Sequence, residues 1–245
     1  MAHLDAGKPN TQYERSCYLF FRVTLPFMSA SPRTLRKPPA RPQARGLRTR
    51  EAILRRAVNI ASLEGLEGLT VGRLAEELRM SKSGLFAHFG SKEELQLATI
   101  ETARQIFIDE ITRPALAAPK GLLRLWNLLD RWLMHVEKEL FAGGCFFTAA
   151  SFEFDGRRGP VRDRIAAIMR EWVAVLDRAV WEAQRAGHII PKASPTLLAH
   201  EIQSMAIGAH WAHQLLDDRM AYARARSTMR ERLRSVATPK SPRLP

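Results

Sequence analysis

The sequence predicts an all-α fold that begins with short helices and continues with long ones. Apolar residues recur every three to four positions from Arg48 onward, and no stretch alternates apolar and polar residues as a half-buried strand does. Ser, Thr, Gly and Pro stand between the periodic segments, where helices begin and end. The chain has 245 residues, 46% of them apolar, which is enough for one fair-sized core or two small domains.

The composition favours an anionic partner. Lys and Arg number 38 against 25 Asp and Glu, a formal net charge of +13 at pH 7, which suits nucleic acid or an acidic lipid surface. Cys17 and Cys145 form no zinc-binding or disulfide pattern, so we expect a reducing, cytoplasmic location. No apolar run approaches the roughly 20 residues of a membrane-spanning helix, so no membrane partner is expected.

Residues 1–47 are expected to form a flexible basic N-terminal extension. Residues 29–47 combine Pro, Ser and Arg without an acidic residue, and they cannot bury enough apolar surface to order themselves. This arm could hold phosphates loosely, or it could be a solubilising tail. Met28 is an alternative start to Met1.

Two amphipathic helices are expected first. One runs from Arg48 to Gly65, and its apolar face consists of Ile53, Ala57, Ile60 and Ala61. Thr70 then stands where an N-cap side chain accepts a hydrogen bond from an early backbone N–H, so a helix of two to three turns should follow it. The inward residues of this second helix are Val71, Leu74, Ala75 and Leu78.

Two further N-caps follow closely. Ser81 begins a short helix that Gly90 stops, with apolar residues at Leu85, Phe86 and Phe89. Ser91 begins a fourth helix, which Glu94 supports by completing a capping box and which Pro114 is expected to bound. Two short helices joined by a tight turn form a helix-turn-helix, whose second helix can enter the roughly 12 Å wide major groove of DNA.

The short helix after Ser81 presents a second face that is small, polar or basic. Its members are Lys82, Ser83, Gly84, Ala87 and His88. Small side chains let the backbone approach DNA closely, and polar or basic ones can reach base edges or phosphates. Lys92 and the backbone N–H groups at the start of the fourth helix can hold phosphate oxygens. Because Lys92 opposes the dipole of that helix, a bound anion would remove the conflict.

Residues from Arg48 to about Phe107 resemble the DNA-binding domain of TetR/AcrR-family transcriptional regulators. The matching residues are Thr70, Val71, Leu74, Ala75, Ser81, Gly84, Leu85, Phe86, His88, Phe89, Lys92 and Leu95. The resemblance implies that the recognition helix extends from Ser81 to Phe89 and that the backbone-contact positions are near Thr70, Phe86, His88 and Lys92. It also implies a homodimer in which each half reads one half-site.

Two positions depart from the family pattern. The family often has Tyr at the place of Phe86, which can pack against a sugar but cannot donate a hydrogen bond to phosphate. The family often has Gly at the place of Arg79, and this arginine could supply a charge instead.

The second half of the chain is expected to be helical over residues 121–138, 160–186, 195–216 and 221–236. An apolar stripe on the second of these helices comprises Val161, Ile165, Ile168, Trp172, Leu176, Ala179 and Ala183. The next helix repeats it with Leu198, Ile202, Met205 and Ala209. One internal core explains these stripes as well as a four-helix bundle of two copies does, and only the resemblance favours the dimer.

Aromatic residues are frequent in this half and suit an apolar ligand cavity. The residues expected to line it are Phe146, Phe147, Trp172, His210 and Trp211. Residues 143–163 also resemble a Gly-Cys-Phe stretch found in the ligand-binding half of some family members.

These observations predict a homodimeric, ligand-responsive repressor that a small apolar effector releases from its operator. A helix-turn-helix DNA-binding domain would occupy residues 48–108, a ligand-binding and dimerisation domain residues 109–237, and a tail residues 238–245. The expected partners are double-stranded DNA and an unidentified small-molecule effector. Neither a cofactor nor a metal is expected, and the sequence has no Ser/His/Asp set or Gly-rich phosphate loop that would indicate an enzyme.

Two other functions remain open. A helical metal-binding protein or enzyme could use His200, His210 and His213, because His210 and His213 have i, i+3 spacing. No carboxylate or thiol with ligand spacing accompanies them. A basic membrane-surface protein would rely only on the charge and on the apolar segment from Tyr18 to Phe27.

Overall fold

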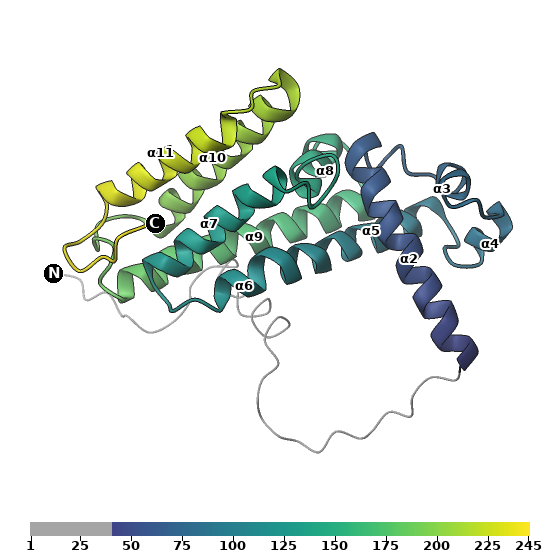
Figure 1. The fold of residues 1–245 in the computed structure, drawn as a ribbon, viewed down its shortest axis with the longest axis horizontal. Coiled ribbons are helices and arrows are strands. Elements are labelled where there is room, and N and C mark those ends of the chain that lie inside the picture. Colours follow the sequence, from purple (N-terminus) through teal and green to yellow (C-terminus); the bar gives the residue numbers. More distant parts are fainter. Residues whose placement is uncertain (1–40) are drawn as a thin grey trace, which may run out of the picture.

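The structure is a computed structural model that describes residues 41–245, and these residues form an elongated, all-helical molecule (Figure 1). The predicted all-α fold is confirmed, and the described residues contain only one isolated bridge, between Ile189 and Ala237, in place of any strand. The alternative start at Met28, the segment from Tyr18 to Phe27 and most of the basic arm lie outside the described residues.

Four helices form the N-terminal domain, which lies at one end of the molecule (Figure 1). They are α2 (Arg41–Glu64), α3 (Val71–Leu78), α4 (Lys82–Phe86) and α5 (Lys92–Phe107). Helix α2 begins at Arg41, earlier than the expected start at Arg48, so its first turns lie within the predicted arm. It ends before Gly65, whose φ of 82° requires the left-handed region.

The three predicted N-caps are confirmed. The side chains of Thr70, Ser81 and Ser91 accept hydrogen bonds from the backbone N–H groups three residues later, at 3.0, 3.1 and 3.0 Å. Glu94 differs slightly from the predicted capping box, because its carboxylate accepts from the N–H of Gly90 rather than from that of Ser91. These bonds set where α3, α4 and α5 begin, and therefore how α4 lies on the domain.

The expectation that Pro114 bounds the fourth helix is wrong. Helix α5 continues through a π-helical turn η1 (Ile108–Thr112) into α6 (Arg113–Leu116), and Pro114 is the second residue of α6. The Arg113 N–H donates to the carbonyl of Ile108, five residues earlier. This wider turn starts a new helical segment at Pro114, and a proline is tolerated in the first turn of a helix.

The second domain consists of α7 (Leu122–Glu137), α8 (Phe146–Phe154), α9 (Pro160–Arg185), α10 (Pro195–Leu216) and α11 (Ala221–Ser235). All but α8 were predicted within a residue or two. Helix α9 lies in the middle of the molecule and packs against α5, α7, α8 and α10 (Figure 1). Helices α10 and α11 pack against each other along the outer edge of the domain.

The apolar stripes predicted for α9 and α10 belong to the core of a single copy. All seven stripe residues of α9 are buried, as are Leu198, Ile202 and Ala209 of α10, while Met205 is partly buried. The internal core therefore accounts for these residues. Other side chains of α10 face outward, among them Leu197, Trp211 and Leu215.

Candidate nucleic-acid interface and ligand cavity

The turn between α3 and α4 is closed by backbone hydrogen bonds. Arg79 is left-handed, with φ 50° and ψ 39°, and its N–H donates to Glu76. The Met80 N–H donates to the Ala75 carbonyl at 3.0 Å, which completes a Schellman motif. The position where the family often has Gly thus has the backbone conformation that Gly adopts with least strain, although an arginine occupies it.

Helix α4 has one side buried in the domain and the other side exposed. Leu85 and Phe89 are buried in the domain, as predicted. The nine residues predicted to contact DNA are exposed or partly exposed: Thr70, Ser81, Lys82, Ser83, Gly84, Phe86, Ala87, His88 and Lys92. Phe86 is 51% exposed, which is unusual for a phenylalanine in a domain whose other large apolar residues are mostly buried. Its ring therefore belongs to the outward surface.

Thr70 and Lys82 come together at the N-terminus of α3. A β-carbon added to Gly72 would lie 3.7 Å from both the Thr70 hydroxyl and Cε of Lys82. Arg56 and Arg73 are held by carboxylates of the same domain, whereas within the described part of the chain no carboxylate forms an ion pair with Lys82. A hydroxyl, an ammonium group and a helix N-terminus form a surface suited to an anion such as phosphate.

Lys92 has a partner within the chain. Its Nζ lies 2.7 Å from Oε1 of Glu67, and this contact lowers the pKa of that carboxyl. The dipole conflict at Lys92 is therefore compensated by a carboxylate of the protein, and it no longer argues for a bound phosphate. The assignment of Lys92 to the DNA surface rests on the family resemblance and on its partial exposure.

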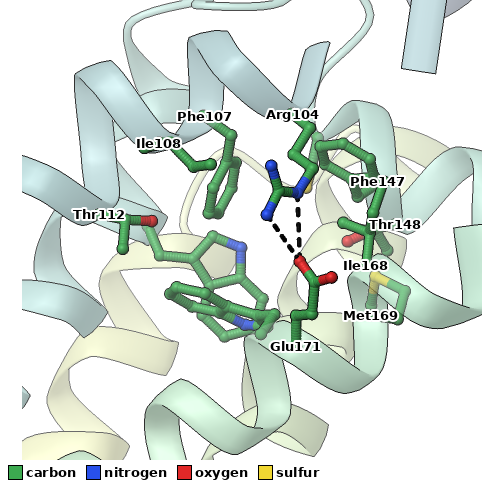
Figure 2. A pocket seen from close by; sticks show the side chains of 12 residues that line it. Arg104, Phe107, Ile108, Thr112, Phe147, Thr148, Ile168, Met169 and Glu171 are labelled. Carbon is green, nitrogen blue, oxygen red and sulfur yellow. Dashed lines mark hydrogen bonds and ion pairs between the residues drawn. The ribbon is translucent and has the colours of Figure 1, made fainter. Parts of the chain in front are cut away.

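A cavity with about 460 Å³ of free space, part of it open to solvent, lies between the two domains (Figure 2). Its walls come from the rod formed by α5 and η1, and from α7, α8 and α9. They are Arg104, Phe107, Ile108, Thr112, Trp132, Cys145, Phe147, Thr148, Ile168, Met169, Glu171 and Trp172. Phe147 and Trp172 thus line the cavity, as the sequence predicts for a ligand site.

Three other residues predicted for the pocket do not line this cavity. Phe146 packs against Phe141 and Phe147, with ring centroids 5.9 and 5.2 Å apart. His210 is buried on α10, where its Nδ1 lies 3.1 Å from the Tyr222 hydroxyl. Trp211 is 53% exposed. Helix α10 packs on α9 and α11 and contributes no wall, so aromatic content alone could not select the lining residues.

An ion pair forms the polar part of the cavity wall. Arg104 on α5 donates from Nε and Nη2 to one oxygen of Glu171 on α9, at 3.1 and 2.9 Å (Figure 2). The other oxygen of Glu171 lies 3.8 Å from Arg164, which also pairs with Glu101. Sequence reasoning missed this pair because its members are 67 residues apart and no motif joins them. The charges of Arg104 and Glu171 therefore compensate each other in this wall.

Cys145 adds a thiol to the cavity wall. Burial raises the pKa of this thiol, but His135 and Thr148 outweigh burial and lower it to about 7. In the sequence, Cys145 only belongs to a Gly-Cys-Phe stretch and forms no zinc-binding or disulfide pattern, and nothing in its spacing indicates the contact with His135 on α7.

The three histidines of the metal hypothesis do not converge. His200 is exposed, His210 contacts Tyr222, and Nδ1 of His213 lies 3.3 Å from the Asp218 carbonyl. Within residues 41–245, no group of three or more His, Cys, Asp or Glu side chains could hold a metal ion. The geometry gives the metal hypothesis no support. None of the described helices is long and apolar enough to cross a membrane.

Comparison with known protein families assigns both domains. The sequence model of the bacterial regulatory proteins of the tetR family matches residues 53–99. The model of the tetracycline repressor-like C-terminal domain matches residues 121–229. The chain belongs to the TetR family.

Individual TetR-family proteins are similar in sequence or fold. The HTH-type transcriptional regulator TcmR of Streptomyces glaucescens is 35% identical over 69 residues, so the match covers 28% of this chain but only 30% of that protein. A TetR regulator from Chloroflexus aurantiacus has a TM-score of 0.73 at 23% identity, covering 79% of this chain and 98% of its own. A TetR-family regulator from Cytophaga hutchinsonii reaches 0.70 at 18% identity, covering 79% and 96%.

TetR-family membership settles the class of protein. The two matches confirm the resemblance noted over residues 48–107 and extend it to α7–α11. A TetR-family protein is a transcriptional regulator with a helix-turn-helix DNA-binding domain, and such a regulator is not an enzyme. In this TetR-family chain, α3 and α4 form the helix-turn-helix.

Proposed function

We propose that this chain is a homodimeric repressor that binds operator DNA through α3 and α4 and leaves it when a small, mainly apolar effector enters the cavity. The observation that carries the proposal is the two-sided packing of α4. Leu85 of α4 and Phe89 just after it are buried in the core, while the other residues of α4, Lys82, Ser83, Gly84 and Phe86, are exposed or partly exposed. A short helix held rigidly in this way can be inserted into a major groove.

The contacts with DNA divide by chemistry. Lys82 and Thr70, beside the N-terminus of α3, hold a phosphate oxygen, and Ser83 with the small residues Gly84 and Ala87 meets base edges. Phe86 packs against a sugar, because it has no hydroxyl to offer a phosphate.

The dimer forms through α10 and α11. A stripe along the outer side of α10 is apolar or small and recurs at steps of three, four and seven residues. It consists of Leu197, Ser204, Gly208, Trp211 and Leu215, all exposed in the single copy. Gly208 has open space where a β-carbon would lie, so a second helix can approach it closely. Two copies of the α10 and α11 pair then form a four-helix bundle.

The effector acts through the rod of α5 and η1. Arg104, Phe107, Ile108 and Thr112 project from this rod into the cavity, and α5 also packs against α2 of the DNA-binding domain. A ligand that pushes the rod aside therefore moves the DNA-binding domain. It favours a dimer state in which the two recognition helices no longer match the half-site separation.

A structural neighbour supports the proposal that one protein of this fold binds both a small molecule and operator DNA. AibR, solved in complex with isovaleryl coenzyme A and operator DNA, has a TM-score of 0.59 at 22% identity, and the match covers 74% of this chain and 95% of that one. It thus holds a small molecule and operator DNA on a similar fold.

DNA selection with the purified full chain tests the proposal. We expect selected sites with two inverted half-sites, whose spacing reports the dimer geometry. On the selected site, Lys82→Ala should lower the slope of log K against log salt by about one, because one phosphate contact is lost. Lys192→Ala is the matched control, since Lys192 lies in the loop between α9 and α10, at the end of the molecule away from α3 and α4 (Figure 1). Binding without a salt-sensitive sequence preference would overturn the proposal.

A further inference from the structure

Four of the twelve residues that line the cavity are aromatic, and their rings meet edge to face. The centroids of Phe107 and Trp172 are 5.2 Å apart at 84°, and those of Trp132 and Trp172 are 5.1 Å apart at 68°. Phe107 and Phe147 are 6.0 Å apart at 87°. Rings set at steep angles to one another offer faces and edges to a further ring, which favours a flat aromatic occupant.

Two buried polar groups in these walls have no hydrogen-bond partner: Nε1 of Trp172 and the hydroxyl of Thr112. Trp172 is only 7% exposed and Thr112 only 1%. An indole N–H can only donate, so the partner that Trp172 lacks is an acceptor atom. An unpaired buried donor is costly and uncommon in native proteins, which points to a group supplied from outside the chain.

The π-helical turn explains why Thr112 is unpaired. In the regular helix α5, the hydroxyls of Thr99 and Thr102 donate to the carbonyls four residues earlier, at 2.7 and 2.9 Å. Thr112 ends the π-helical turn η1, and its hydroxyl has no such bond. Together with Ile108 it faces the cavity (Figure 2). Turns of this kind are frequent at functional sites.

The guanidinium and the carboxylate of the cavity wall already balance each other. Arg104 and Glu171 are joined by two hydrogen bonds, and Arg164 with Glu101 continues the network. A charged ligand would have to break this pair or bring an unpaired charge into an apolar space, which is costly. A neutral ligand leaves the pair intact.

We propose that the cavity binds a neutral, flat aromatic molecule with a ketone-type oxygen, which accepts a hydrogen bond from the indole N–H of Trp172. This deepens the proposed function, since it takes the cavity to be the effector site. The aromatic side chains of the wall pack against the ring system of the ligand. The ketone oxygen accepts the hydrogen bond of the Trp172 N–H, and the hydroxyl of Thr112, at the end of η1, offers a second polar contact.

Three probes of nearly equal shape separate these requirements in isothermal titration calorimetry with the full chain, without DNA. Fluorenone is flat, neutral and carries a ketone, fluorene lacks the oxygen, and a fluorenone carboxylate adds a charge. We expect fluorenone to bind about tenfold more tightly than fluorene, as one buried hydrogen bond would give. The carboxylate should bind more weakly than fluorenone.

Trp172→Phe removes the N–H and keeps an aromatic ring, so the preference for fluorenone should fall to about twofold. Trp181→Phe is the matched control, because Trp181 lies on α9 outside the cavity lining, and it should keep the tenfold preference. The idea fails if fluorene binds as well as fluorenone, if the carboxylate binds best, if Trp172→Phe keeps the preference, or if no probe binds. The comparison of probes on the unmodified chain decides even if Trp172→Phe does not fold.

The release of selected operator DNA, followed by fluorescence anisotropy, separates this inference from the proposed function. If fluorenone binds with the expected preference but leaves DNA bound, the ligand class stands and the role of the cavity in release falls. If other compounds release DNA while fluorenone shows no preference over fluorene, the ligand class falls and the repressor role stands.

Discussion

Burial strongly lowers the pKa of His210. It lies on α10 against the Tyr222 hydroxyl of α11, with the His135 ring of α7 and the His213 ring nearby. Burial first, and then the positive charges of these two histidines, lower its pKa from 6.5 to about 4. The unfolded chain therefore takes up a proton between pH 6.5 and pH 4 more readily than the folded chain does, so stability is lost as the pH falls through this range.

Replacing His210 should remove this pH dependence. We expect the free energy of unfolding of the unmodified chain, measured in urea, to fall by about 1 to 2 kcal/mol more between pH 7 and pH 5 than that of His210→Asn. His200→Asn, on the exposed side of the same helix, should behave like the unmodified chain. An equal fall in His210→Asn would mean that other groups cause the acid sensitivity.

For single residues, the sequence predicted burial well, but it did not predict which partner an exposed side chain contacts. Leu85 and Phe89 are buried as their spacing indicated. Lys92 was expected to bind an external anion, yet the carboxylate of Glu67, from the loop before α3, forms an ion pair with it. Helical periodicity fixes the direction of a side chain, whereas its partner depends on a loop whose path no local pattern specifies.

At the scale of elements, the predictions succeeded where a helix has one buried face. Helix α8 was missed because its residues Phe146, Phe147, Thr148, Ala150 and Phe154 are buried on several sides, between α2 and α9, so no stripe appears. The π-helical turn before Pro114 was missed for a different reason. A proline predicts an interruption of the helix, but it does not say whether the chain turns away or continues along the same axis.

The left-handed backbone of Arg79, which ends α3, can be tested by substitution. Arg79 holds a left-handed conformation that costs an L-residue roughly 1 kcal/mol relative to Gly. Arg79→Gly should therefore raise the free energy of unfolding by about 0.5 to 1 kcal/mol. If Arg79 also supplies the charge that the DNA surface gains at this position, the salt slope of operator binding should fall by about one.

Glu139 provides the matched control for Arg79. It is exposed, it lies in the second domain, and its φ of 52° is also left-handed. Glu139→Gly should stabilise the chain by a similar amount and leave the salt slope unchanged. A loss of stability in Arg79→Gly would show that contacts of the arginine side chain outweigh the strain of its backbone.

For the whole molecule, the sequence indicated two helical parts but not the space between them. The cavity is made by residues from four segments, and its Arg104 and Glu171 pair exists only because α5 and α9 cross in the folded chain. Apolar stripes likewise could not separate a core from a dimer surface. Once the stripe residues of α9 are seen to be buried in one copy, the exposed apolar residues of α10 become the informative ones.

Trp211 is the residue on which the proposed dimer is best tested. A large aromatic side chain near the middle of an interface is typically among its strongest contributors, and a carboxylate there would be buried without a partner. We therefore expect Trp211→Glu to weaken dimerisation by about thirtyfold or more in sedimentation equilibrium. Operator binding should weaken with it, because a monomer contacts one half-site at a time.

Phe152→Glu is the matched control for this change. Phe152 is 56% exposed, close to the 53% of Trp211, but it lies on α8 and not on the α10 stripe. Its replacement should leave both dimerisation and operator binding unchanged. If the dimer withstands Trp211→Glu, or if Phe152→Glu disrupts it, the interface does not lie on the α10 stripe. The spacing of the two recognition helices would then not be set by α10.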